Sequence, residues 1–185
     1  MRCFIAIDID EGIKRSVSEL QNELKGCNAD LRWVKPENIH LTLKFLGDVE
    51  EKRIDKIKGK LIDACARYNA FTIEIKGMGL FPDKKRPRVL WVDVRDNNSL
   101  LGIQRDIEDA MASIGFEKED RGFSPHLTIA RFRSLKGIEA LYDKIQLHKD
   151  DSLGLMDVKT VSLMESKLKP SGPEYRRVAE VCLKV

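Results

Sequence analysis

The sequence lacks a long apolar run and has few residues of the kinds that form cross-links. Its 185 residues include four cysteines, three histidines and six prolines. No segment approaches the roughly 20 apolar residues of a membrane span, and the apolar run at residues 3–7 is too short for a signal peptide. The cysteines form no C-x-x-C pair, which is typical of a reducing compartment. We therefore expect a cytoplasmic monomer that does not bind membranes.

The sequence also lacks an excess of charge of one sign. It has 33 basic and 30 acidic residues, so the formal net charge is only +3 and no long-range field favours a nucleic acid. Any contact with RNA must therefore be local. Basic residues gather at positions 84–88, and at 167–169 with Arg176 and Arg177 nearby. Each cluster is either solvated loop charge or a local contact surface.

The length suits one compact domain, residues 1–185, with a core that needs no disulfide or metal. Within it, the hexapeptide that begins at His40 with His-Leu-Thr is echoed by a similar hexapeptide at His126, 86 residues later. The first residues of four further pairs of segments are related by the same offset, to within one residue. They are the apolar runs 3–7 and 89–93, the amphipathic stretches 13–24 and 100–111, the helix-like segments 52–66 and 138–149, and the strand-like runs 71–75 and 157–161.

The pattern of each repeat thus predicts the order strand, helix, strand, helix and strand. One more strand follows, at residues 88–94 after the first repeat and at residues 177–183 after the second. Residues 88–94 would both close the first unit and open the second. We expect an α+β fold that is bilobal and duplicated about a pseudo-twofold axis, with two antiparallel sheets facing a central cleft and helices outside. No Gly/Ser-rich linker separates the halves, so the two lobes should be intimate parts of a single domain.

Two of the three histidines open the repeated motif, which is the strongest functional signal in the sequence. Residues two apart on a strand share a face, so His40 points with Thr42, and His126 with Thr128, while the residues between them point to the core. A pseudo-twofold axis would bring two imidazoles and two hydroxyls together. The third histidine, His148, has no threonine two residues on and is predicted to lie at the surface.

Two imidazoles suit concerted acid and base catalysis, because an unperturbed pKa of about 6.5 allows one ring to be neutral and its partner charged. Opening a cyclic phosphodiester needs this combination, and hydroxyl groups can stabilise the phosphate oxygens. A lone histidine on a strand is more often structural, but two copies at one offset favour catalysis. Neither His40 nor His126 has a Cys, Asp or Glu in ligand register, so we expect no metal and no cofactor.

These motifs resemble the two-histidine (2H) phosphoesterase superfamily, in particular its LigT-like branch of RNA 2′,3′-cyclic phosphodiesterases, also called 2′-5′ RNA ligases. The resemblance covers nearly the whole chain. The matching segments are residues 4–7, 33–47, 81–82 with 87–91, 125–131, and 165–166 with Gly172, Pro173 and Tyr175.

The resemblance implies a bilobal α+β fold and metal-free hydrolysis of an RNA-terminal 2′,3′-cyclic phosphate to a 2′-phosphate. It implies that His40 is the proton donor to the leaving 3′ oxygen and that His126 is the base that activates water. Thr42, Thr128 and Arg131 would bind the phosphate. The expected partners are RNA ends or nucleotides that carry a 2′,3′-cyclic phosphate.

The alternation of side chains between the two faces of a strand conflicts with the site roles of two residues, Arg131 and Phe45. On an ideal strand Arg131 faces away from His126, so a bulge, a twist or the strand end must redirect it. Phe45 likewise shares the core face of Leu41, and both core packing and base stacking remain open for it. Trp33 and Trp91 lie in apolar surroundings and are predicted to pack in the core. The Gly172-Pro173 pair predicts a turn before the last strand.

Two other functions remain open. Ligation that forms 2′,5′ linkages is the reverse reaction, in which a 5′-hydroxyl replaces water and the same two histidines act. A non-catalytic RNA-end binder would retain affinity without turnover, although the intact histidine and threonine pairs argue against it.

Overall fold

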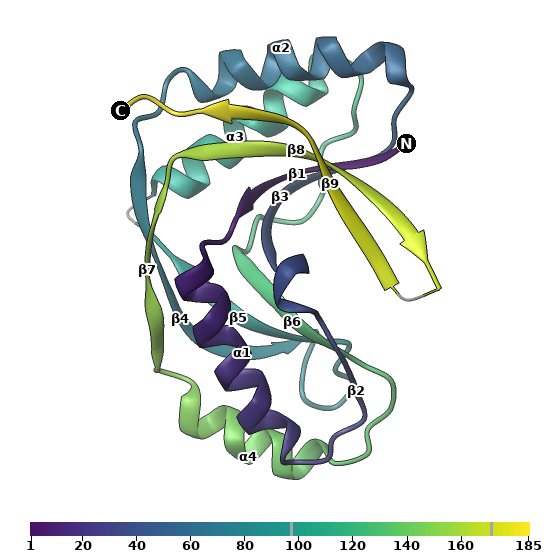
Figure 1. Cartoon of the computed structure of the whole chain (residues 1–185), viewed down its shortest axis with the longest axis vertical. Coiled ribbons are helices and arrows are strands. Elements are labelled where there is room, and N and C mark those ends of the chain that lie inside the picture. Colours follow the sequence, from purple (N-terminus) through teal and green to yellow (C-terminus); the bar gives the residue numbers. More distant parts are fainter. Residues whose placement is uncertain (97, 171) are drawn as a thin grey trace.

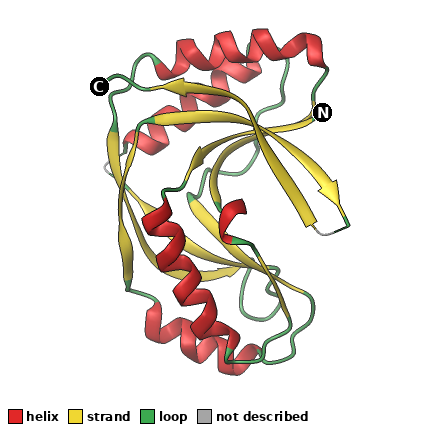
Figure 2. Cartoon of the chain, in the orientation of Figure 1, coloured by secondary structure: helices red, strands yellow, loops and turns green. Residues whose placement is uncertain are grey.

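The computed structural model describes residues 1–96, 98–170 and 172–185. Its helices and strands are shown in Figure 2. The strands are β1 (Arg2–Asp8), β2 (Leu31–Trp33), β3 (His40–Asp48), β4 (Phe71–Phe81), β5 (Val89–Arg95), β6 (His126–Phe132), β7 (Ser152–Val158), β8 (Thr160–Lys169) and β9 (Gly172–Cys182). The α-helices are α1 (Glu11–Lys25), α2 (Ile54–Cys65), α3 (Ser99–Ala112) and α4 (Ile138–His148), and two short 3-10 helices are η1 (Pro36–Asn38) and η2 (Glu51–Arg53).

The strands form a curled antiparallel sheet in the order β7-β4-β5-β6-β3-β1-β8-β9, with β2 paired to β6. At its middle, β3 and β6 share a single residue pair, Leu41 with Leu127. The sheet therefore divides there into a first half-sheet (β3-β1-β8-β9) and a second half-sheet (β6-β5-β4-β7), which lie in the upper and lower parts of Figure 1. This arrangement confirms the expected bilobal α+β architecture.

The two sequence repeats exchange elements between the half-sheets. Strand β4, from the first repeat, pairs with β5, and strand β8, from the second repeat, pairs with β1. Helix α1 likewise contacts β7 of the second half-sheet, while α3 contacts β3 of the first. Helices α2 and α3 thus cover the first half-sheet, and α1 and α4 the second (Figure 1). Residues 88–94 were expected both to close the first repeat and to open the second. The structure explains this, because β5 pairs with β4 along one edge and with β6 along the other.

One hydrophobic core runs behind both half-sheets, and the predicted amphipathic stretches form part of it. Helix α1 begins where the Asp10 carboxylate accepts a 2.7 Å hydrogen bond from the Ile13 amide, which caps the helix N-terminus. The predicted apolar faces of the two long helices are buried, as expected. They consist of Ile13, Val17, Leu20 and Leu24 on α1, and Leu100, Ile103, Ile107 and Met111 on α3.

The structure corrects the sequence prediction at the weaker elements. Strands β2 and β7 were not predicted, and the strand-like run 157–161 spans the end of β7 and the start of β8. The last strand begins at Gly172 and not at residue 177, so Gly172-Pro173 belongs to β9 and pairs with β8. Strand β2 has only three residues, and β7 contains Gly154, so neither gives a clear alternating pattern.

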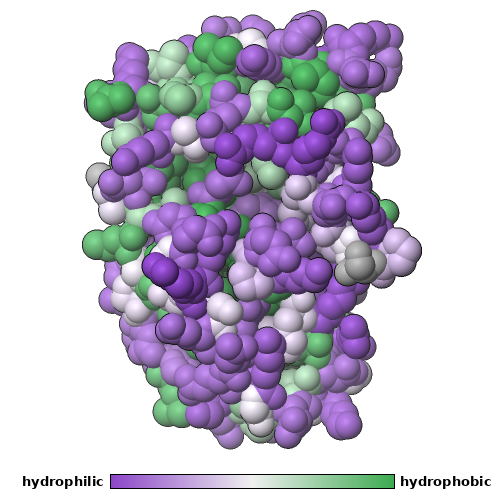
Figure 3. Space-filling model, in the orientation of Figure 1, coloured by the Kyte–Doolittle hydropathy of each residue, from purple (hydrophilic) through white to green (hydrophobic). Residues whose placement is uncertain are grey.

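Hydrophilic side chains cover most of the face shown in Figure 3. None of the helices in the described part of the chain has the length and apolar character needed to cross a membrane.

Candidate active site

His40 and His126 are the first residues of β3 and β6, the two strands that meet at the centre of the sheet. In both strands the residue after the histidine is a fully buried leucine, whereas the histidine and threonine are only partly buried. They therefore point away from the helices. We call the side of the sheet that carries His40, Thr42, His126 and Thr128 the histidine face.

The β3–β6 register brings the two motifs together. The strands are antiparallel and pair at Leu41 and Leu127, the central residues of the two His-Leu-Thr sequences. His40 and Thr42 flank this pair on β3, and His126 and Thr128 flank it on β6, so the four side chains lie next to the point where the two strands meet. In an antiparallel pair, the residues on either side of a paired position point to the opposite face from the paired residues themselves. The predicted constellation of two imidazoles and two hydroxyls is thus on one surface.

Both imidazoles are oriented by the same backbone contact. The Nδ1 atom of His40 lies 2.9 Å from the carbonyl oxygen of Asn38, and Nδ1 of His126 lies 2.7 Å from that of Ser124. A carbonyl oxygen only accepts hydrogen bonds, so Nδ1 must carry the proton in each ring. This contact leaves both Nε2 atoms available for proton transfer.

Aromatic rings enclose His40. The Phe4 ring lies 4.7 Å from the imidazole, centroid to centroid, and Tyr175 packs edge-on at 5.0 Å. Burial lowers the pKa of His40, while the hydrogen bond to Asn38 and the nearby Asp8 carboxylate act in the opposite direction. His126 contacts one ring, that of Phe81, at 5.1 Å.

An aspartate lies opposite each histidine, a feature that the sequence analysis missed. Asp8 of β1 pairs with His40, and Asp93 of β5 pairs with His126. Each carboxylate also accepts a hydrogen bond from an arginine, Asp8 from Arg177 at 2.8 Å and Asp93 from Arg95 at 3.1 Å. The offset between the two aspartates is one residue shorter than the histidine offset, so a strict 86-residue comparison does not align them.

A β-bulge in each central strand resolves the parity conflict. In β3, Ile5 pairs with Lys44 but Ala6 pairs with Thr42, so Leu43 is left without a partner. In β6 the residue without a partner is Ile129. One extra residue turns the following side chains to the other face of the sheet. The bulges therefore place Phe45 and Arg131, which occupy equivalent positions in the repeats, on the histidine face.

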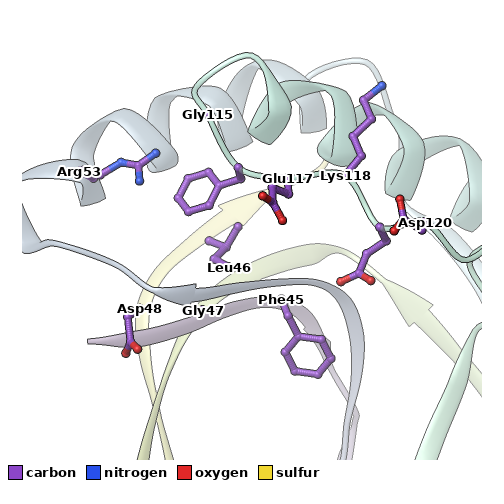
Figure 4. Close-up of a pocket in the computed structure, with 11 residues that line it drawn as sticks. Phe45, Leu46, Gly47, Asp48, Arg53, Gly115, Glu117, Lys118 and Asp120 are labelled. Carbon is purple, nitrogen blue, oxygen red and sulfur yellow. The ribbon is translucent and has the colours of Figure 1, made fainter.

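Exposure agrees with this reorientation. Phe45 is 60% exposed, so the core alternative for this residue is wrong. Figure 4 shows its ring on the opposite side of β3 from the Leu46 side chain. Arg131 is also exposed and forms no ion pair with any residue that the structure describes.

A buried glutamine supports each bulge from behind the sheet. Gln21 of α1 donates to the Ile129 carbonyl at 2.9 Å, and Gln104 of α3 donates to the Leu43 carbonyl at 3.3 Å. Both side chains are almost completely buried. Gln104 supplies a donor to the carbonyl of Leu43, which has no partner on β1, and Gln21 adds a second donor to the Ile129 carbonyl, which also accepts from the Val34 amide at 3.0 Å.

The bulge in β3 also turns Lys44 into the core. Its ammonium donates at 2.8 Å to both the Glu108 carboxylate of α3 and the Glu117 carbonyl. Glu108 in turn accepts a hydrogen bond from the Glu119 amide at 3.0 Å. A buried charge needs such partners. The pair thus joins β3 to the segment that leads toward β6.

Trp91 departs from its predicted place in the core. It pairs with Thr128, and so it shares the histidine face. Its ring stacks on Phe81 at 4.9 Å, and Phe81 touches His126. Trp33 does pack against the main core, as predicted. The apolar neighbours of Trp91 in sequence gave no indication of its face, because only the register with β6 determines it.

An open pocket of about 520 Å³ lies beside the histidine face (Figure 4). It is formed by the end of β3, by Arg53 and by residues 115–120 of the connection between α3 and β6, and it includes neither histidine. The Arg53 guanidinium is already occupied, since it donates to the Ile114 carbonyl at 2.8 Å and lies over the Phe116 ring. The other charged side chains that line it are Lys118, which pairs with Asp109, and four carboxylates, Asp48, Glu117, Glu119 and Asp120. This composition does not suit a phosphate ligand.

Ion pairs neutralise the basic cluster of the β8–β9 hairpin and one residue of the cluster at positions 84–88. In the β8–β9 hairpin, Lys167 and Arg176 pair with Glu165, and Lys169 pairs with Glu174. In the other cluster, Lys84 pairs with Glu139 on α4. These contacts favour structural roles for Lys84 and for the basic residues of the hairpin.

His148 joins two helices. Its ring contacts Glu23 of α1 at 3.0 Å and Asp151 at 2.8 Å, at the end of α4. The described residues contain no group of three or more His, Cys, Asp or Glu side chains that could hold a metal ion.

Comparison with known proteins supports the duplicated pattern. A family model described as LigT like Phosphoesterase matches the chain twice, at residues 7–91 and 92–175. A protein of Methanothermobacter thermautotrophicus named RNA 2′,3′-cyclic phosphodiesterase is 37% identical over 175 residues, which is 95% of each chain. A protein of the same name from Thermotoga maritima is 33% identical over 180 residues, covering 97% of this chain and 94% of the relative.

Solved structures show the same fold. The crystal structure of TT0787 of Thermus thermophilus aligns with a TM-score of 0.84 and 22% identity, covering 100% of this chain and 98% of that one. Escherichia coli LigT complexed with 3′-AMP aligns with a TM-score of 0.80 and 22% identity, covering 98% and 97%.

Proposed function

The chain belongs to the LigT-like phosphoesterase family, and on that premise we propose that it hydrolyses RNA-terminal 2′,3′-cyclic phosphates to 2′-phosphates without a metal. The names of its relatives support this substrate class. The observation that carries the proposal is the meeting of His40 and His126 at the β3–β6 crossing, each with Nδ1 bound to a carbonyl and Nε2 available.

In this reaction His126 is the base and His40 the acid. Nε2 of neutral His126 takes a proton from water as the water oxygen attacks phosphorus. The bond between phosphorus and the 3′ oxygen breaks, and Nε2 of protonated His40 gives its proton to that oxygen. The products are a 3′-hydroxyl and a 2′-phosphate, and the histidines have exchanged protonation states. Proton exchange with water restores them.

The neighbouring side chains stabilise the charge that develops on the phosphate. Thr42 and Thr128 donate hydroxyl hydrogen bonds to the non-bridging oxygens, and Arg131 adds a charged donor. The two His-Leu-Thr sequences meet at their central leucines, which suits a phosphate held between the strands. Phe45 offers an exposed ring on the same face on which the terminal base can stack.

The test is incubation of the protein, in EDTA, with an oligoribonucleotide that ends in a 2′,3′-cyclic phosphate, followed by identification of the terminal group. The proposal predicts a 2′-phosphate. A 3′-phosphate would mean that the 2′ oxygen leaves. Joined RNA in the presence of 5′-hydroxyl ends would identify ligation as an activity of the same site. Binding without any product would refute hydrolysis.

A further inference from the structure

Arg32 is an exposed arginine that the proposed reaction does not use. It is the middle residue of β2, the short strand that pairs with β6 beyond the point where β3 separates from it. Its direct partner in the register is Arg131. Residues directly opposite each other in an antiparallel pair point to the same face. Since the β6 bulge turns Arg131 to the histidine face, Arg32 lies on that face too.

The burial of the neighbouring residues supports this orientation. Leu31 is buried and Trp33 is half-buried against the main core, while Arg32 between them is exposed. The Val34 amide that follows donates to the bulged Ile129 carbonyl at 3.0 Å, and Gln21 bonds both Val34 and Ile129. Strand β2 is therefore fixed to β6 at the bulge, so the position of Arg32 relative to Arg131 is set by backbone contacts.

The two arginines bring like charges together without compensation. Directly opposite like charges destabilise a strand pair. Within the described residues, neither Arg32 nor Arg131 forms an ion pair, although most cations of the β8–β9 hairpin do. Tyr175, whose ring touches His40, lies within electrostatic reach of both guanidinium groups. An anion bound at the histidine face would supply the missing charge.

The position of Arg32 on β2, opposite Arg131 of β6, indicates which anion this is. Its partner Arg131 is four residues beyond Leu127, which is roughly 13 Å at the 3.3 Å rise of a strand. Arg131 can reach back toward the phosphate between the histidines. Arg32, on the neighbouring strand, is suited to a second phosphate further along the RNA. The group of that kind nearest to a 3′-terminal cyclic phosphate is the phosphodiester on the 5′ side of the terminal nucleoside.

We propose that Arg32 forms a second phosphate subsite that binds the phosphodiester preceding the terminal nucleoside, so that the protein prefers RNA ends over cyclic mononucleotides. The inference rests on the proposed hydrolysis, and it adds a residue that would make the protein select RNA ends over cyclic mononucleotides. A guanidinium that contacts a phosphate contributes to binding of the ground state and the transition state alike, so its loss should raise KM without changing kcat.

The test compares two substrates with the Arg32→Gln variant. One is adenosine 2′,3′-cyclic phosphate, which has no upstream phosphate, and the other is the dinucleotide ApA with a terminal 2′,3′-cyclic phosphate. We expect KM for the dinucleotide to rise about tenfold with kcat unchanged, and kinetics on the mononucleotide to stay the same. The dependence of log(1/KM) on log salt should weaken by about 0.7 for the dinucleotide. Arg32→Lys should recover part of the affinity.

Arg15→Gln is the matched control, because Arg15 is an exposed arginine on α1 and its loss changes the net charge equally. It should leave both substrates unaffected. Equal losses on both substrates in Arg32→Gln would place Arg32 at the reacting phosphate and overturn the subsite, as would no loss on either. No turnover of either substrate by the unmodified protein would instead refute the proposed hydrolysis, and the subsite with it.

Discussion

At the scale of single residues, the proposed reaction depends on the hydroxyl groups of Thr42 and Thr128. We expect Thr42→Val to lower kcat roughly tenfold to thousandfold, because it removes one preorganised donor to the phosphate and keeps the β-branched shape of the side chain. Thr42→Ser retains the hydroxyl and should keep most of the activity. Steady-state kinetics on a cyclic-phosphate substrate measure both variants. An equal loss in the two variants would show that packing, and not hydrogen bonding, explains the effect.

A second prediction at this scale concerns the pH dependence of His40. As the acid, His40 must be protonated, and this form is lost as pH rises through its pKa. Burial lowers that pKa, so kcat/KM should begin to fall at a pH below the ordinary histidine range. Asp8 raises the pKa, so Asp8→Asn should move the alkaline limb of the profile to still lower pH. Were His40 the base, the same variant would move the acid limb.

At the scale of elements, the β-bulges decide which residues reach the site. We expect Gln21→Met to lower the free energy of unfolding by about 1–3 kcal/mol, because the carbonyls of Val34 and Ile129 both lose the side-chain donor that they share inside the protein. The same change should lower activity, since the bulge directs Arg131. Urea unfolding and kinetics measure the two effects. Exposed Asn22→Met is the control, and equal stability of the two variants would contradict the role assigned to Gln21.

The elements also show what the sequence could predict and what it could not. The sequence correctly predicted that His40 and Thr42, and likewise His126 and Thr128, share the strand face opposite to the buried leucines, because a two-residue period on a strand is local information. The faces of Phe45 and Arg131 needed the bulges, and a bulge is visible only when the partner strand gives the register. The same holds for Trp91, Asp8 and Asp93, whose relation to the histidines comes from pairing between strands distant in sequence.

At the scale of the whole molecule, each half-sheet is completed by elements of the other repeat. We therefore expect fragments 1–85 and 86–185, divided in the exposed connection between β4 and β5, to remain unfolded when expressed separately. In the first fragment β4 has lost β5 and β7, and β1 has lost β8. Co-expressed fragments should associate and recover activity. A cooperative urea transition of fragment 1–85 alone would contradict the interdependence of the lobes.

The repeat arrangement also explains why the active site is proposed at the centre of the molecule. Among the described strands, β3 and β6 are the pair that connects the half-sheets in the β-ladder, and each begins with a histidine. The exchange of β4, β8, α1 and α3 holds the half-sheets together around that crossing. A rigid relation between the two histidines follows, which acid and base catalysis on one phosphorus atom requires.

The most direct test of this account is a double-mutant comparison of His40→Ala, His126→Ala and the variant carrying both changes. The rate of conversion of an oligoribonucleotide 2′,3′-cyclic phosphate would be measured at saturating enzyme in EDTA, with folding checked by circular dichroism. Because the two imidazoles act in one step, each single change should abolish nearly all catalysis, and the double variant should be little worse than either. A single variant that keeps the rate within about tenfold of the unmodified protein would contradict the paired mechanism.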